Sequence, residues 1–229
     1  MNKKPTPKYD PKTFDRPSVT VDALVFTIVD DVLKVALVKR AGEPFKDYWA
    51  LPGGFIDMKE TLEETVKRKL SLKAGYENLY LEQLATFGDP KRDPRTRVIT
   101  VVYFALTSAD NYRSVTSESV TDSQLFDVKK LPTELAFDHK AIIKFGIKRL
   151  KSKIQYSNIA YGLLPKEFTL TELQKVYEVI LGTTIDKRNF RKKMLATKLL
   201  TSTKKKRAES AHRPAELFRF RSTDLEFFN

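Results

Sequence analysis

The sequence predicts an α/β domain followed by a smaller, basic helix-turn-helix domain. Over the first 150 residues, runs of β-branched and aromatic residues alternate with patterns of helical spacing. After residue 163, two helical patterns are separated by a short turn that contains a glycine. The positive charge is concentrated in the last third: residues 151–229 hold 17 Lys and Arg against 8 Asp and Glu, whereas residues 1–150 hold 25 against 21. This asymmetry is compatible with a second domain that binds a polyanion.

Each predicted element of the first domain has a local signal. Asp30 and Asp31 supply turn chemistry between two alternating runs, which predicts a β-hairpin. Gly75 is the expected end of the first helix, and Asp138 is the expected N-cap of the second. The predicted strands are 19–27, 32–39, 79–87, 98–107 and 122–127, and the predicted helices are 61–74 and 139–153, followed by a connector over 152–161.

The second domain begins with a helix that has clear boundaries. Thr169 and Glu172 have the spacing of a capping box, and Gly182 is the expected end of this helix. Asp186 is then expected to cap a second helix, residues 187–195, which is apolar on one side and basic on the other. Short strands at 199–201 and 216–220 enclose a basic turn at 204–207, so the pattern predicts a winged helix-turn-helix domain.

Composition limits the cellular setting. The chain has 229 residues and 0 cysteines, so it has no disulfide and no thiolate metal site, which agrees with a reducing cytoplasm. The polar, proline-containing start lacks the apolar core of a signal peptide, and the longest apolar runs have only strand length. We therefore expect a cytoplasmic protein without a membrane partner, with a flexible arm at 1–17, one domain at 18–153 and a second at 154–229.

A recurring motif lies around the first predicted helix. Gly54, Glu60, Arg68 and Gly75 fall at the spacings of the Nudix signature, preceded by a Trp-Ala-Leu-Pro-Gly-Gly approach. The region resembles a Nudix domain, and this resemblance implies an α/β/α sandwich with a mixed sheet. Nudix hydrolases cleave a diphosphate joined to another moiety, using helix glutamates that hold Mg²⁺ or Mn²⁺.

The three glutamate positions that follow Arg68 in this signature carry Lys69, Leu72 and Lys73. Ammonium groups repel a divalent cation, so we expect no catalytic residue and no required metal. Glu60, Glu63 and Glu64 could hold a metal ion weakly, but acidic residues are also expected at a helix N-terminus. The alternative, a hydrolase acting on ADP-ribose or a related nucleoside diphosphate, would need Mg²⁺ or Mn²⁺ at these positions.

The domain can keep a ligand pocket without catalysis. A lysine can bind phosphate as a point charge, so Lys73, with Lys69 as a second possibility, is expected to replace the metal at a bound pyrophosphate. Trp49, Phe45 and Tyr48 could stack on a base, although core packing is the commoner role. The expected ligand-binding residues are Arg40, Gly54, Arg68, Lys73, Arg95 and Arg97, and Arg92 is a further candidate from the same loop as the last two.

Both halves together resemble the Nudix-related transcriptional regulators. The resemblance spans 19–220 and includes Arg68-Lys69-Leu70, Phe168-Thr169-Leu170 and Asn189-Phe190-Arg191-Lys192. It implies a homodimer that binds double-stranded operator DNA and responds to ADP-ribose or a sugar metabolite. A DNA-binding module with an inert Nudix scaffold remains a third possibility. The expected DNA-binding residues are Lys187, Arg188, Asn189, Arg191, Lys192, Lys204, Lys205, Lys206, Arg207 and Arg213.

Overall fold

The computed structural model describes residues 13–74, 80–112, 116–207 and 214–228, with the backbone alone for 71–74. A seven-stranded mixed sheet forms the first half, with the order β3-β2-β1-β6-β5; β4 also pairs with β1, and β7 with β2. β1 and β6 are parallel, and the other pairs are antiparallel. The strands are β1 (Ser18–Val29), β2 (Val32–Arg40), β3 (Trp49–Ala50), β4 (Gly53–Phe55), β5 (Tyr80–Phe87), β6 (Val98–Leu106) and β7 (Val120–Asp127).

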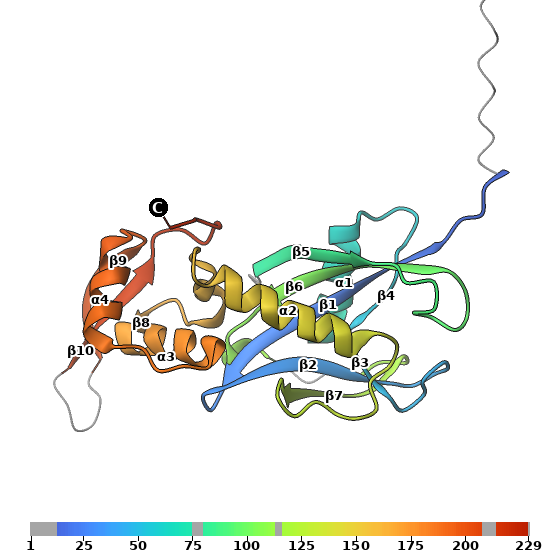
Figure 1. The fold of residues 1–229 in the computed structure, drawn as a ribbon, viewed down its shortest axis with the longest axis horizontal. Helices are drawn as coiled ribbons and strands as arrows, with labels where there is room; N and C mark the ends of the chain where they lie inside the picture. Colours follow the sequence, from blue (N-terminus) through green and yellow to red (C-terminus); the bar gives the residue numbers. More distant parts are fainter. Residues whose placement is uncertain (1–12, 75–79, 113–115, 208–213, 229) are drawn as a thin grey trace, which may run out of the picture.

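Two helices cover opposite faces of this sheet, α1 (Leu62–Ala74) and α2 (His139–Lys153) (Figure 1). Alternate residues of a strand point to opposite faces, and the two hydrophobic clusters follow this alternation. Val21, Ala23 and Val25 of β1 share a cluster with Val66 and Leu70 of α1. The intervening positions pack with α2 in the other cluster, as Leu24, Phe26, Ile142 and Ile143 show. The expected α/β/α sandwich is therefore confirmed.

The second half is a winged helix. Its three-stranded sheet has the order β8-β10-β9, formed by β8 (Phe168–Thr169), β9 (Leu200–Arg207) and β10 (Ala215–Phe220). The helix α3 (Leu170–Leu181) packs on this sheet, and α4 (Lys187–Ala196) packs on α3, where the rings of Tyr177 and Phe190 are 5.2 Å apart. Every predicted cap in this half is present: Thr169 and Glu172 form the capping box, Asp186 accepts a hydrogen bond from the Asn189 N–H at 2.8 Å, and Gly182 has a φ of 75°.

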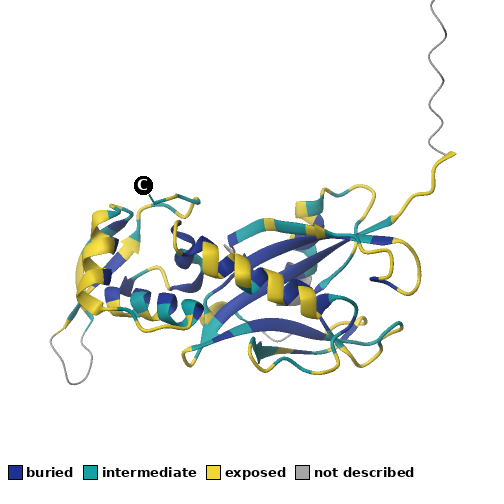
Figure 2. Cartoon of the chain, in the orientation of Figure 1, coloured by how far each residue is buried: buried dark blue, intermediate teal, exposed yellow. Residues whose placement is uncertain are grey.

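One continuous core joins the two halves, as the buried residues in Figure 2 show. The expected connector is partly buried: Ile154 and Ile159 are fully inaccessible, and residues Ile159–Leu163 form the short 3-10 helix η3. Another 3-10 helix, η2 (Ala109–Asn111), lies before β7. A Cβ at Gly162 would lie 2.8 Å from the Cβ of Leu106, so η3 packs directly on the sheet of the first half.

A buried ion pair reinforces the same junction. The ammonium of Lys153, the last residue of α2, donates to Glu82 of β5, which also accepts a hydrogen bond from the Tyr80 hydroxyl. The Lys153 side chain is only 4% exposed and lies over the ring of Tyr80, which contacts the ring of Tyr161 in η3 at 5.8 Å. The junction is a packed interface, with a more exposed ion pair between Lys175 and Asp31 at 3.0 Å.

Several sequence predictions were wrong. The basic residues at 204–207 do not form a turn: they lie on β9, which is longer than the predicted strand 199–201. Asp138 is at the N-cap position of α2, but its side chain makes no cap hydrogen bond, because it binds Arg92. The short strands β3, β4 and β8 and the helix η3 were not predicted. The expected arm lies mainly outside the described residues, as do Gly75 and residues 208–213. Among the described residues, no helix is long and apolar enough to cross a membrane.

Candidate effector site and DNA interface

The acidic residues at the start of α1 are held by neighbouring groups. Glu64 accepts from the Thr61 N–H at 2.8 Å and its own N–H donates to the Thr61 hydroxyl at 3.2 Å, which is a capping box. Glu60 accepts two hydrogen bonds of 2.6 Å from Arg68 and one of 3.0 Å from Thr65, and the bonds from Arg68 lower the pKa of Glu60. Both carboxylates therefore stabilise the local fold.

The donor set does not fit a catalytic metal. In the described part of the chain, no group of three or more His, Cys, Asp or Glu side chains is arranged to hold a metal ion. Glu63 is exposed in the first turn of α1, and Glu60 is already neutralised by Arg68. Lys69 occupies the first of the three glutamate positions and is half-buried. Lys73 and Leu72 lie in the last turns of α1, and their side chains are outside the described residues.

Two glycines allow β4 to approach its neighbours closely. A Cβ at Gly53 would lie 2.2 Å from the Asp22 carboxylate and 2.4 Å from the Val21 carbonyl oxygen, so no larger residue fits there. Gly54 has a φ of 152°, and a Cβ there would lie 3.1 Å from the Lys69 ammonium nitrogen. The glycine pair therefore brings the strand backbone against Asp22 on one side and places the Lys69 side chain beside Gly54.

A buried polar network contacts residues 51–54, the glycine loop. The Thr100 hydroxyl donates to Asp22 at 2.6 Å, and the backbone N–H of Leu51 donates to Nδ1 of His139 at 2.9 Å. His139 is 3% exposed, and burial lowers the pKa of its imidazole. His139 thus has a structural position beneath the segment that leads into the glycine pair.

Arg92 also belongs to this support. Its guanidinium donates to both carboxylate oxygens of Asp138, at 3.0 and 2.8 Å, and its side chain is only 4% exposed. The interpretation of Arg92 as a ligand-binding residue was wrong, because this buried pair fixes the β5–β6 loop to the start of α2.

Two of the expected ligand-binding arginines meet at one aromatic ring. The guanidinium carbon of Arg40 lies 5.1 Å from the centre of the Phe137 ring, and that of Arg95 lies 5.9 Å from it. Arg95 also lies 5.4 Å from the ring centre of Phe55, which is 45% exposed. Burial and then repulsion from Arg95 lower the pKa of Arg40. Arg95 is paired with Asp93 at 3.0 and 2.8 Å, so the net positive charge here comes from Arg40. A positive charge beside partly exposed aromatic rings suits an anionic ligand with a planar group.

The structure brings together only part of the expected ligand set. Arg68 and Gly54 belong to the Nudix signature, residues 54–75, which we call the box, and Arg40 and Arg95 lie at Phe137. Arg97 is an exposed residue that donates to the Gly88 carbonyl at 2.5 Å. Phe55 and Phe137 were missed by sequence reasoning, because an isolated phenylalanine carries no signal of its contact with an arginine. Trp49 packs against Phe126 at 4.7 Å, and Phe45 against Phe137 at 4.9 Å, which are packing contacts.

The helix α4 presents a basic surface. Phe190 and Met194 are buried against the domain, with exposed fractions of 5% and 1%. These two residues are four positions apart and define the inner face of the helix, so the charged residues lie outward or on its flanks. The exposed polar residues of α4 include all five expected ones: Lys187, Arg188, Asn189, Arg191 and Lys192.

The basic residues of β9 have different surroundings. Lys205 pairs with Glu167 at 2.8 Å, and Arg207 pairs with Glu172 at 2.7 Å, so both have carboxylate partners. Lys204 and Lys206 are exposed on the same strand. Arg213 lies outside the described residues.

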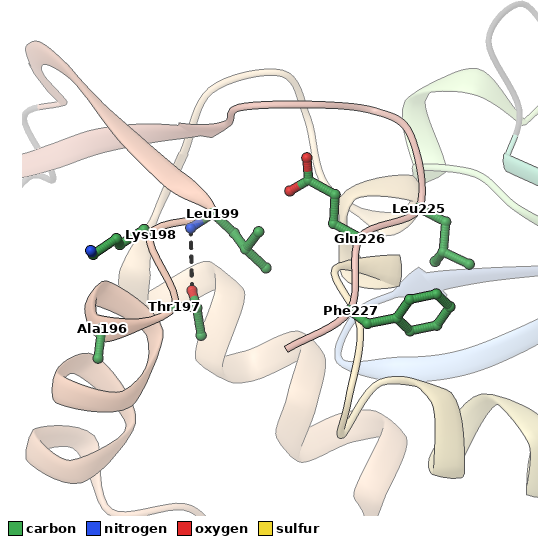
Figure 3. A pocket seen from close by; sticks show the side chains of 7 residues that line it. All are labelled: Ala196, Thr197, Lys198, Leu199, Leu225, Glu226 and Phe227. Atoms are coloured by element: carbon green, nitrogen blue, oxygen red, sulfur yellow. Dashed lines mark hydrogen bonds between the residues drawn. The ribbon is translucent and has the colours of Figure 1, made fainter. Parts of the chain in front are cut away.

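A cavity of about 550 Å³ lies behind this surface, between the end of α4 and the C-terminal segment (Figure 3). Residues 196–199 line one side, and 225–227 line the other. It carries a single lysine and a single glutamate among its lining residues, and none of these residues belongs to the Nudix signature or to the pair Arg40 and Arg95. It is therefore not the candidate effector site.

Comparison with known proteins agrees with this division of the chain. Residues 19–145 match the model of the NUDIX domain, and residues 160–220 match that of the NrtR DNA-binding winged helix domain. The ADPR responsive transcriptional repressor NtrR of Acinetobacter baylyi is 37% identical over 222 residues, which cover 96% of this chain and 88% of the relative. This chain belongs to the Nudix-related transcriptional regulators.

Other relatives of this regulator are of two kinds. Shewanella oneidensis NrtR in complex with a 27mer DNA is 42% identical, with a TM-score of 0.79 over 88% of this chain and 93% of that one. Its NUDIX domain in complex with ADP ribose is 44% identical, with a TM-score of 0.56 over 62% and 94%. The ADP-ribose pyrophosphatase of Methanocaldococcus jannaschii is 34% identical over 144 residues, which cover 63% of this regulator and 80% of that enzyme.

Proposed function

We propose that this regulator is an ADP-ribose-responsive repressor that acts as a homodimer in the cytoplasm. The Nudix domain, residues 18–153, binds the effector, and the winged helix domain, residues 154–229, binds operator DNA. One observation supports this assignment most strongly: a winged helix with an exposed basic helix α4 is joined to a Nudix domain whose box carries lysine at a metal-ligand position.

DNA binding is assigned to α4 and β9. The outward residues of α4 can enter a major groove while the strand contacts phosphates. Lys205 and Arg207 must exchange a carboxylate partner for a phosphate, so their contribution is smaller than that of Lys204 and Lys206. A two-fold symmetric operator is expected for a homodimer.

Effector binding is assigned to the glycine loop and the arginine pair. Arg40 and Arg95 at Phe137 provide positive charge beside aromatic surface, and Gly54 and Arg68 lie at the box. ADP-ribose changes DNA affinity only if it binds more tightly to one arrangement of the dimer than to the other. Because the core is continuous from the sheet to η3, we expect the change between dimer arrangements to occur mainly between protomers.

The test combines two measurements on the full chain. A duplex is selected from a random-sequence pool by the purified protein, and its affinity is then measured with and without ADP-ribose, at one stated salt concentration. The proposal expects tight, sequence-selective binding that ADP-ribose weakens. Absence of selected DNA, or an affinity that ADP-ribose leaves unchanged, would contradict it.

The second candidate function is hydrolysis of ADP-ribose with Mg²⁺ or Mn²⁺. The identity to the M. jannaschii ADP-ribose pyrophosphatase favours it. The charges of Lys69 and Lys73 oppose it, because they stand where metal-binding glutamates are needed. Release of AMP from ADP-ribose at enzyme-like rates, dependent on the added metal, would establish the hydrolase.

A further inference from the structure

The box helix differs from a metal site in the sign of its charge. Glu60 is neutralised by the two hydrogen bonds from Arg68, so this pair leaves no net negative charge beside Lys69. The neighbouring Lys69 side chain then contributes an additional positive charge. A cluster with a net positive charge repels Mg²⁺ and attracts an anion.

The position of the Lys69 ammonium is set by Gly54. Its nitrogen lies 3.1 Å from the point that a Cβ at Gly54 would occupy, so the side chain folds back onto the backbone of β4. A residue with a side chain at Gly54 would compete for this space. The ammonium therefore lies at the meeting point of the glycine loop and the box helix.

The acidic group that attracts the Lys69 ammonium, Glu60, is already bonded to Arg68 and does not pair directly with Lys69. Lys69 is half-buried, and within the described ranges it makes neither an ion pair nor a hydrogen bond. Burial, followed by the charge of Arg68, lowers the pKa of its ammonium. Partial desolvation of an unpaired charge is unfavourable, and an anionic ligand at this point would remove the penalty. Lys67, two residues earlier on the same helix, is exposed instead.

We propose that the Lys69 ammonium binds the diphosphate of a nucleoside diphosphate ligand in place of a divalent metal ion. The inference rests on the proposed function, and it adds that effector binding is independent of Mg²⁺ and Mn²⁺. A phosphate oxygen accepts a charge-assisted hydrogen bond from the lysine, beside Gly54. No bond is broken, so the ligand leaves unchanged.

The test is calorimetric titration of the full-length protein with ADP-ribose, in EDTA and again with excess Mg²⁺. The unmodified protein is expected to bind equally well under both conditions. Lys69→Met is expected to weaken binding about 10- to 100-fold, the loss typical of one charge-assisted hydrogen bond. Lys69→Arg keeps the charge and retains most of the affinity, and Lys67→Met is the matched control with unchanged affinity. Adenosine, which has no phosphate, is expected to bind Lys69→Met and the unmodified protein equally.

Each outcome separates the two proposals. ADP-ribose affinity in Lys69→Met equal to that of the unmodified protein overturns the role of Lys69 and leaves the proposed function standing. Binding that requires Mg²⁺ also overturns it. Absence of ADP-ribose binding by the unmodified protein in both buffers overturns the proposed function and this inference together. Thermal melting of each variant shows whether a loss of binding is caused by unfolding. If Lys69→Met is unfolded, the affinity of Lys69→Arg for ADP-ribose decides: retained affinity supports the role of Lys69, and lost affinity in a folded Lys69→Arg protein overturns it.

Discussion

The imidazole of His139 accepts a hydrogen bond from the backbone N–H of Leu51, 2.9 Å away, although 88 positions separate them in the sequence. This bond ties the first residue of α2 to the segment that leads into the glycine pair. Because Nδ1 accepts, the neutral imidazole carries its proton on Nε2, which lies 3.9 Å from Asp22. A neutral His139 therefore maintains the shape of the candidate effector site.

Protein stability is expected to decrease as the pH falls below about 6.5, the ordinary pKa of histidine. Burial lowers the pKa of His139, so the unfolded chain takes up a proton in this range before the folded protein does. The free energy of unfolding therefore increases with pH in this range, and the contribution of the neutral His139 to stability is lost as the pH falls. Urea unfolding at pH 7.5 and pH 5.5 measures the change. His139→Asn keeps an acceptor but does not titrate, so its pH dependence should be weaker; equal dependence in both proteins would contradict the assignment.

Gly53→Ala is expected to destabilise the protein by about 3 kcal/mol or more, since its new Cβ would lie 2.2 Å from the Asp22 carboxylate and close to a backbone carbonyl. Gly42→Ala is the matched control, because no atom lies within 4 Å of its added Cβ, and we expect a change within about 0.5 kcal/mol. Denaturant midpoints compare the two variants. A Gly53→Ala protein as stable as Gly42→Ala would show that β4 and β1 can separate at little cost.

Lys153→Met is expected to cost about 2 kcal/mol, less than the roughly 3–5 kcal/mol of a fully buried broken pair. The Lys153 side chain is 4% exposed, whereas Glu82 is 27% exposed and keeps Arg149 at 3.7 Å, so the remaining carboxylate is partly compensated. Lys151→Met, at an exposed position of the same helix, should be nearly neutral. Thermal unfolding followed by circular dichroism tests both. Equal melting temperatures would mean that the pair does not stabilise the junction.

Arg188→Ala is expected to weaken binding to the selected duplex and to reduce the slope of log affinity against log salt by about 1, if the residue contacts a phosphate. Arg188 is exposed at the start of α4. Lys148→Ala removes one positive charge from an exposed position on α2 and should leave the slope unchanged. Fluorescence anisotropy over a range of salt concentrations measures the slopes. A common slope for the two variants would place α4 away from the DNA.

Local sequence signals were sufficient to predict those features of the structure that depend on residues close together in the sequence. Thr169 caps α3 and Asp186 caps α4 because a capping side chain needs only the N–H groups two or three residues ahead. The box spacing likewise identified Glu60 and Arg68, whose bidentate pair spans eight residues. The strands followed from alternating residues, and the mixed sheet was implied by the resemblance to the Nudix domain.

Non-local contacts account for the wrong predictions. Arg92 resembles a ligand-binding residue in the sequence, but it is buried against Asp138, 46 residues away. Asp138 is therefore unavailable as a side-chain cap. The strands β3 and β4 have only two and three residues, which is too short to show an alternating pattern. The basic segment 204–207 extends β9 because Lys206 and Arg207 pair with Glu216 and Ala215 of β10, a contact that the lysine-rich sequence does not suggest.

The sequence alone determined the class of the protein: the box spacing, the replacement of metal-binding glutamates by lysines, and the capped basic helix. These features depend on residue identity and on distances of a few residues along the chain. Only the tertiary structure decided which charges are paired and which remain available. Arg92, Lys153 and Arg207 have carboxylate partners supplied by distant segments, whereas the Lys69 ammonium is brought against Gly54 without such a partner among the described residues. Electrostatic function depends on these distances in space, which arise when the chain packs around its core.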